Sequence, residues 1–84
     1  MKMVKLNIKD ITGEEANFNF NMDEDDRLRS IELRLLRSFA ARKINVTSLR
    51  FIGDKGNGEV GRIPSMTRVR DLKDGVIKVT KPEK

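Results

Sequence analysis

The sequence has no cysteine, histidine, tryptophan or tyrosine, and it has only two prolines. These absences exclude a disulfide, a thiol nucleophile, an imidazole acid or base, and the usual Cys/His zinc site. No apolar run approaches the roughly 18 residues that span a bilayer. No apolar stretch of signal-peptide length follows Met1–Lys5. We therefore expect a soluble protein of the cell interior, cytoplasmic or, in a eukaryote, also nuclear.

The 84 residues carry 18 basic and 13 acidic side chains, a formal net charge of +5. A chain of this length buries only about 60–65% of its unfolded surface, so it forms a single domain with one modest core. The positive charge favours acidic partners, and it raises the question of nucleic acid.

The first 22 residues have the pattern of a β-hairpin. Apolar and polar residues alternate from Val4 to Ile8 and again from Ala16 to Met22, which is the period of half-buried strands. Gly13 lies between these segments, where a tight loop needs a residue that tolerates positive φ.

The next segment has the period of an amphipathic helix, expected from about Asp26 to Ala41. Its apolar stripe consists of Leu28, Ile31, Leu35 and Phe39. Four acidic residues, Asp23–Asp26, precede the stripe, and we expect one of the aspartates to cap the helix.

The remainder predicts a short third strand around Leu49–Ile52, a loop at Gly53–Gly58 and a very short strand within Glu59–Ile63. The last strand is expected at Val76–Thr80, with Ile77 and Val79 pointing inward. The resulting order is an α+β fold in which a mixed four- to five-stranded sheet packs on one α-helix.

Three motifs in this order resemble the ubiquitin-like β-grasp family, which includes ubiquitin and the SUMO modifiers. Lys9–Gly13 is similar to the first hairpin loop of ubiquitin. Ser48–Phe51 is similar to the opening of the third strand in SUMO proteins, and Asp74–Val79 to their closing strand. The resemblance covers residues 1–80 as one ubiquitin-like β-grasp domain, and leaves 81–84 as a charged C-terminal tail.

The resemblance also bears on function. Family members that are attached to other proteins end in Gly-Gly, whereas this sequence ends in Lys81–Lys84. We therefore expect a non-conjugating relative; the alternative is a modifier whose Gly-Gly tail is absent from this sequence. In the apolar patch that ubiquitin uses for binding, Ile11 matches the loop position. Arg50 or Ile52 matches the position on the third strand, and Thr80 the one on the last. Because the patch is mostly replaced, ubiquitin receptors are not expected as partners.

Strand alternation predicts a polar, basic face on the open side of the sheet. It presents Lys5, Asn7, Lys9, Asn17, Asn19, Asn21, Arg50, Ile52, Lys78 and Thr80. Such a face suits an acidic protein segment or a phosphate backbone, although a solvated sheet face has the same pattern. Without outward aromatic residues, only non-specific contact with nucleic acid is expected.

In SUMO-like proteins, a groove between the second strand and the helix accepts an extended peptide as an added strand. The resemblance therefore implies a groove formed here by Phe20, Arg27 and Arg34, which we expect to take a peptide with acidic flanks. Leu33, among arginines on the outside of the helix, is a further candidate anchor. The plain alternatives are a polar edge that stays soluble and an isolated surface leucine.

No catalytic constellation is present, because no histidine is available to activate any serine. The acidic residues lack EF-hand spacing, and the glycine-rich segment Gly53–Gly61 lacks the ending of a P-loop. We expect no enzyme activity, no cofactor and no metal. The sequence predicts a monomeric protein-interaction module, with a non-specific nucleic-acid-binding domain as an alternative. The predicted partner-binding residues are Lys5, Arg50, Ile52, Lys78, Ile11, Phe20, Arg27, Arg34 and Leu33.

Overall fold

The alternating N-terminal segment forms an antiparallel hairpin. In the computed structural model, which describes residues 1–9, 11, 13–55 and 58–82, β1 (Lys2–Ile8) pairs with β2 (Ala16–Met22). The register runs without interruption from Lys2 opposite Met22 to Ile8 opposite Ala16. Gly13 has a φ of +80°, which glycine adopts without steric cost. Asp10 and Thr12, part of the expected loop motif, lie outside the described residues.

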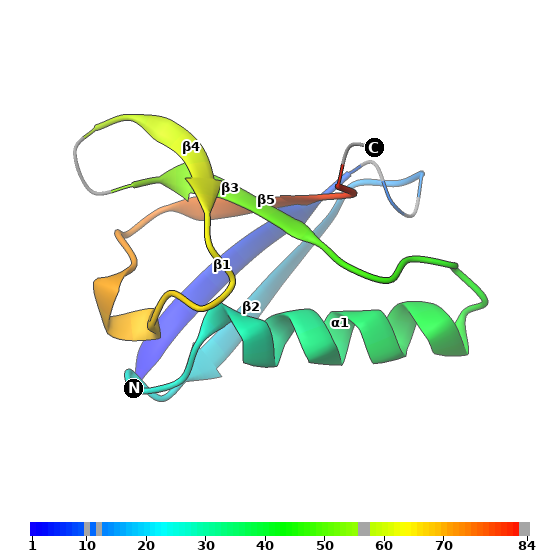
Figure 1. The fold of residues 1–84 in the computed structure, drawn as a ribbon, viewed down its shortest axis with the longest axis horizontal. Helices are drawn as coiled ribbons and strands as arrows, with labels where there is room; N and C mark the ends of the chain where they lie inside the picture. The colour runs from blue at the N-terminus through cyan, green and yellow to red at the C-terminus, as the bar shows by residue number, and fades with distance from the viewer. Residues whose placement is uncertain (10, 12, 56–57, 83–84) are drawn as a thin grey trace.

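Three further strands complete the sheet: β3 (Arg50–Asp54), β4 (Val60–Ile63) and β5 (Val76–Thr80). The order is β2-β1-β5-β3-β4, with β5 parallel to β1 and antiparallel to β3 (Figure 1). A short 3₁₀ helix, η1 (Val69–Asp71), precedes β5. The predicted α+β class and mixed sheet are confirmed.

The loop after β3 begins later than the sequence predicts. Gly53 and Asp54 were expected in the loop, but they extend β3 because they pair with Gly61 and Val60 of β4. The short fourth strand is therefore a full hairpin partner of β3. Residues 56 and 57 of the predicted loop, like residues 83 and 84 of the tail, lie outside the described residues.

The helix α1 (Leu28–Ala41) has the predicted stripe but not the predicted cap. Its N-cap residue is Arg27, and no side chain caps its first turn. Instead, the backbone N–H of Leu28 donates to the carbonyl of Thr67, and that of Arg29 to Ser65, at 3.1 and 2.7 Å. The distant segment around Pro64–Arg68 therefore satisfies amides that an aspartate was expected to bind.

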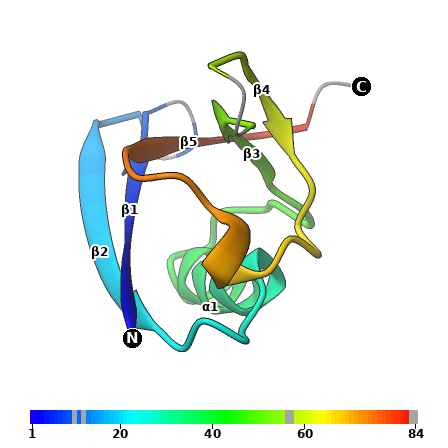
Figure 2. The same cartoon turned by 90° about the vertical axis from the view of Figure 1, so that its left-hand side faces the viewer.

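The core lies between α1 and the concave face of the sheet. In Figure 2 the sheet curves around the helix, with β1 and β2 on one side and β3 and β4 on the other. The largest fully buried side chains come from several elements: Leu6, Ile8, Leu28, Ile31, Phe51, Val69 and Val79. The arrangement is β-grasp-like.

One charged side chain lies inside this core. Glu32 is only 3% exposed. Its Oε2 accepts the N–H of Leu49 at 2.9 Å, and its Oε1 lies 2.6 Å from Nη1 of Arg29. Because Leu49 directly precedes β3, Glu32 joins the helix to the start of that strand. Within the described part of the chain, no helix has the length and apolar character needed to cross a membrane.

Candidate functional site

The face of the sheet that points away from α1 carries four of the nine residues that the sequence assigns to a partner, namely Lys5, Arg50, Ile52 and Lys78. We call it the outer face. It alternates along each strand with the buried side chains, such as Leu6, Phe51 and Ile77. Its members are Met3, Lys5, Asn7, Asn17, Asn19, Asn21, Arg50, Ile52, Asp54, Val60, Arg62, Val76, Lys78 and Thr80.

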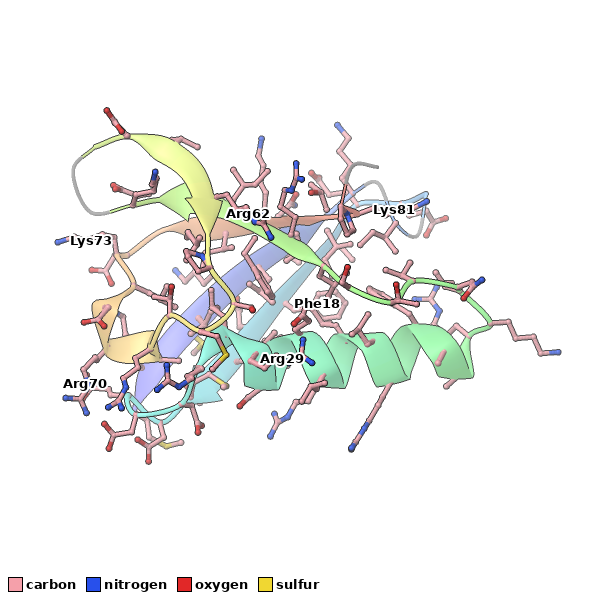
Figure 3. The ribbon with its side chains drawn as sticks, in the orientation of Figure 1. Phe18, Arg29, Arg62, Arg70, Lys73 and Lys81 are labelled. Carbon is pink, nitrogen blue, oxygen red and sulfur yellow. The ribbon has the colours of Figure 1, made fainter. Side chains whose placement is uncertain are left out.

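The strand register brings the predicted basic residues together. Ile52 lies between Lys78 on β5 and Arg62 on β4, because it is paired with both. Lys5 on β1 is paired with Val76 of β5, two residues before Lys78. Arg62 was not among the predicted residues, although its alternation with buried Ile63 is visible in the sequence. Figure 3 shows Phe18 on the side of the sheet that faces the helix.

The structure also resolves which residue of β3 occupies the outer face. Arg50 and Ile52 both do, because the residues that alternate with them, Phe51 and Gly53, are buried. Arg50 is opposite Thr80. It is partly buried, and its Nε is enclosed without a hydrogen-bond partner among the described residues. Arg50 therefore contributes packing as well as charge, unlike the exposed Lys5 and Lys78.

An apolar hollow of about 380 Å³ interrupts the outer face beside the start of β5. Val60 and Val76, 75% and 55% exposed, are among its lining residues, as are Ile52 and the buried Leu72. The sequence analysis missed this feature. The sequence indicated it only through Val60 and Val76, two valines at outward positions of the short strands β4 and β5.

The second candidate surface is the free edge of β2 beside the helix. β2 is the first strand of the sheet and pairs only with β1. Phe18 and Phe20 lie on its inner side, because they are opposite the buried residues Leu6 and Val4. Phe20 packs against the core, whereas Phe18 remains 37% exposed. The two rings are stacked, with centroids 6.4 Å apart. We call this edge, with Phe18 and Phe20, the β2 edge.

The helix residues predicted for a partner lie in three different places. Glu32 faces Leu49 and thus the β3 side. At 100° per residue, Arg34 lies about 160° from Glu32 around the axis, on the side of β2. Leu33, 43% exposed, lies on the side turned away from the sheet and belongs to neither surface. Arg27 lies at the helix N-terminus, where its Nη1 donates to the carbonyl of Met66 at 2.7 Å.

Ile11 does not lie on either surface. The resemblance placed it at an exposed loop position, but it is only 7% exposed and belongs to the hydrophobic core. Its side chain therefore lies in the core and is not available to a partner. The assignment of Ile11 as a surface contact is wrong for that reason.

The described residues bring together no group of three or more aspartate, glutamate, histidine or cysteine side chains able to hold a metal ion. Comparison with models of known protein families and with curated proteins found no match. The two surfaces described above therefore carry the functional proposal.

Proposed function

We propose that this chain is a non-enzymatic, ubiquitin-like interaction module. It binds an extended segment of a partner protein along the β2 edge, and its outer face contacts acidic residues of the same partner. The single observation that carries this proposal is the unprotected edge of β2. The sheet order and the three sequence motifs that resemble ubiquitin and SUMO support the family assignment.

The two edges of the sheet differ in their protection. β4 has only four residues, carries Arg62 and is followed by Pro64. β2 has seven residues, no charge and no proline, and its register with β1 is unbroken by a bulge. Soluble proteins normally blunt edges with short strands, charges, prolines or bulges. The edge of β2 has none of these four protective features, and it is therefore suited to accept another strand.

The inner side of β2 supplies apolar surface for such a strand. Alternate side chains of an added strand point toward the helix layer, where they meet Phe18 and the neighbouring side of α1. Phe18 is exposed because β2 lies at the margin of the helix-covered face. Main-chain hydrogen bonds then supply affinity, and the contacts with Phe18 supply preference for apolar residues at alternate positions.

The outer face adds electrostatic attraction. Lys5, Arg62 and Lys78 are exposed, and the chain carries a net charge of +5. A face of this sign steers acidic segments toward the molecule and makes the association rate depend on salt.

The test is selection from a displayed library of random nine-residue peptides, followed by an NMR titration of the selected peptide. We expect peptides with alternating apolar residues, and shifts in the backbone amides of residues 16–22. Phe18→Asp should abolish binding, whereas Val60→Asp, on the opposite edge strand, should retain it. Peptides that shift other residues and leave 16–22 unchanged would refute the proposal.

Non-specific binding of nucleic acid is the second candidate, because the outer face is basic. The chain has four phenylalanines, and none lies on that face: Phe39 and Phe51 are buried, and Phe18 and Phe20 lie on the inner side. Single-strand binding usually depends on aromatic stacking. A mixed-sequence single-stranded oligonucleotide should therefore bind weakly. Tight binding that survives Phe18→Asp but is lost in Lys5→Glu/Lys78→Glu would favour nucleic acid.

A further inference from the structure

The side of α1 that faces away from the sheet is a surface that the proposed function does not use. In Figure 1 the helix lies along the lower margin of the molecule, with the sheet above it. Residues four apart form a ridge along a helix, and the ridge opposite the buried stripe consists of Arg29, Leu33, Arg37 and Ala41. All four are exposed. We call this ridge, together with Arg34 beside it, the α1 face.

The exposed charge of the α1 face is entirely basic. The only acidic residue of α1 is Glu32, which is buried and paired with Arg29. Among the residues that the structure describes, none forms an ion pair with Arg34 or Arg37. On either side of the helix, β2 and residues 44–49 contain no charged side chain. The two central arginines of this face therefore keep their charge available to a partner.

The acidic segment before the helix does not neutralise these arginines. Asp23–Asp26 lie before the first helical turn, whereas Arg34 and Arg37 follow the start of α1 by six and nine positions, about 9 and 14 Å of helix. Exposed charges are largely screened beyond about 8 Å at physiological ionic strength. At the other end, Arg42 and Lys43 follow α1 and extend the basic surface, although cations there also favour the helix dipole.

Leu33 gives the same face an apolar centre. Its side chain is 43% exposed, and Arg29 and Arg37 lie one turn before and one turn after it on the ridge. Ala40 and Ala41 are exposed and short, so a second helix can approach to an axis separation of about 8–10 Å. An apolar residue between arginines, beside short side chains, suits a helix that has an apolar strip and acidic flanks.

Three other occupants fit the α1 face less well. The phosphates of a nucleic acid pair with arginines but make no use of Leu33. A membrane-surface helix turns a broad apolar side to the lipid, whereas the apolar stripe of α1 is buried in the core. A second copy of the chain presents arginines to arginines, and like charges across an interface oppose binding. An acidic helix supplies both the pairing groups and the apolar contact.

We propose that the α1 face binds an amphipathic helix of a partner protein in which acidic residues flank an apolar strip. Leu33 is the apolar anchor, and Arg34 and Arg37 pair with the acidic residues. This inference goes beyond the proposed function, because it involves neither the β2 edge nor the outer face. It therefore holds or fails independently of strand addition.

The first test compares three synthetic helical peptides of 18 residues on an alanine background. All three share a strip of leucines and a hydrocarbon staple on the far side that keeps them helical. The positions flanking the leucines are all glutamate, all glutamine or all lysine. Fluorescence anisotropy at low salt should show at least about tenfold tighter binding of the glutamate peptide than of the glutamine peptide, narrowing in 0.5 M salt. Equal binding of the glutamate and glutamine peptides would overturn the inference.

A matched pair of double variants separates local from overall charge. Arg34→Glu/Arg37→Glu and Arg68→Glu/Lys81→Glu each lower the net charge from +5 to +1 at exposed positions. The first should weaken binding of the glutamate peptide at least about tenfold, and the second less than about threefold. Arg34→Gln/Arg37→Gln, a milder change, should give an intermediate loss. Equal weakening by the two charge reversals would assign the effect to overall charge and overturn the inference.

The apolar anchor is tested separately from the charges. Leu33→Ser should weaken binding of the glutamate peptide about tenfold, because it removes the apolar contact at the centre of the ridge. Val60→Ser, at a more exposed apolar position on β4, should leave binding unchanged. If Leu33→Ser has no effect, the face attracts acidic groups without recognising a helix, and the inference fails.

An NMR titration with the glutamate peptide locates its binding site. We expect shifts in the backbone amides of residues 29–43. Shifts confined to the outer face, or no binding at 1 mM, would overturn the inference. A short DNA duplex, or vesicles of anionic lipid, might compete for the same arginines. Tighter binding of either probe than of the glutamate peptide, lost in Arg34→Glu/Arg37→Glu, would assign the α1 face to that class of ligand instead.

Discussion

The buried carboxylate of Glu32 has two partners, and they indicate its structural role. One oxygen accepts the N–H of Leu49, and the other pairs with Arg29, whose side chain remains half exposed. The group therefore satisfies a buried backbone donor while keeping one contact toward solvent. Through Glu32, α1 contacts the residue before β3 by a hydrogen bond and not by apolar packing.

Replacing Glu32 should separate these two contributions. Glu32→Ala leaves the Leu49 N–H without an acceptor, and we expect a loss of about 2–4 kcal/mol in the free energy of unfolding. Glu32→Gln keeps a carbonyl acceptor, and should lose only about 1 kcal/mol. Urea unfolding measures both. Equal losses in the two variants would mean that the charge, rather than the hydrogen bond to Leu49, matters most.

Two glycines on neighbouring strands provide a matched pair. A Cβ on Gly53 would lie 3.0 Å from Cδ1 of Ile63 and 3.5 Å from Cγ1 of Ile77, both in the core. A Cβ on Gly61 would lie 2.9 Å from Cδ of Lys55, an exposed side chain that can move. Gly53→Ala should therefore destabilise more than Gly61→Ala, with a difference of about 1 kcal/mol by urea unfolding. The reverse order would mean that Ile63 has room to rotate.

At the scale of the elements, the strands of the hairpin follow directly from their alternation. The start of α1 does not. Asp23–Asp26 indicated a side-chain cap, but the acceptors are the carbonyls of Ser65 and Thr67. Those residues are more than 35 positions away in sequence, so no local pattern contains the information.

The same limit applies to the candidate surfaces. Alternation placed Lys5, Ile52 and Lys78 on one face because period two is a local property. It could not show that Ile11 is buried, since this depends on packing against residues that are distant in the sequence. Nor could it show that Phe18 is exposed, since this depends on β2 being the edge strand.

Comparison of two phenylalanines tests the position of β2 at the margin of the core. Phe39 on α1 is 2% exposed, whereas Phe18 on β2 is 37% exposed. Phe39→Ala should cost about 3–5 kcal/mol in the free energy of unfolding. Phe18→Ala should cost about 1 kcal/mol, because much of its ring is already in water. A loss above about 3 kcal/mol for Phe18→Ala, measured by urea unfolding, would show that the ring of Phe18 belongs to the core and is not open surface.

Over the whole molecule, charge is separated by location. Basic residues lie on the outer face and along the outside of α1, whereas six of the acidic residues lie at the ends of β2. The formal charge of +5 therefore describes no single surface. A partner that contacts both the outer face and the β2 edge therefore meets different sets of charged residues at the two places.

Reversing two outer-face charges should change association but not stability. Lys5→Glu/Lys78→Glu lowers the net charge from +5 to +1, since each reversal removes two units. Both side chains are exposed, so we expect stability within about 0.5 kcal/mol per site. Association with an acidic partner should slow, and its salt dependence should weaken.

The control is Arg68→Glu/Lys81→Glu, which makes the same change in net charge at exposed positions outside both the outer face and the α1 face. It should retain most of the association rate, as measured by stopped-flow mixing. Equal slowing in the two double variants would assign the effect to overall charge and not to the outer face.

The position of β5 has a consequence for how the molecule folds. The β1–β2 and β3–β4 hairpins share no ladder, and β5 is the strand that links them. Its contact with β1 joins Lys5 to Val76, about seventy residues along the chain. Each hairpin can form early from neighbouring residues, but the sheet closes only when this late segment inserts between them. We therefore expect the search for that insertion to limit the folding rate, and removal of β5 to leave the two hairpins without any shared strand pairing.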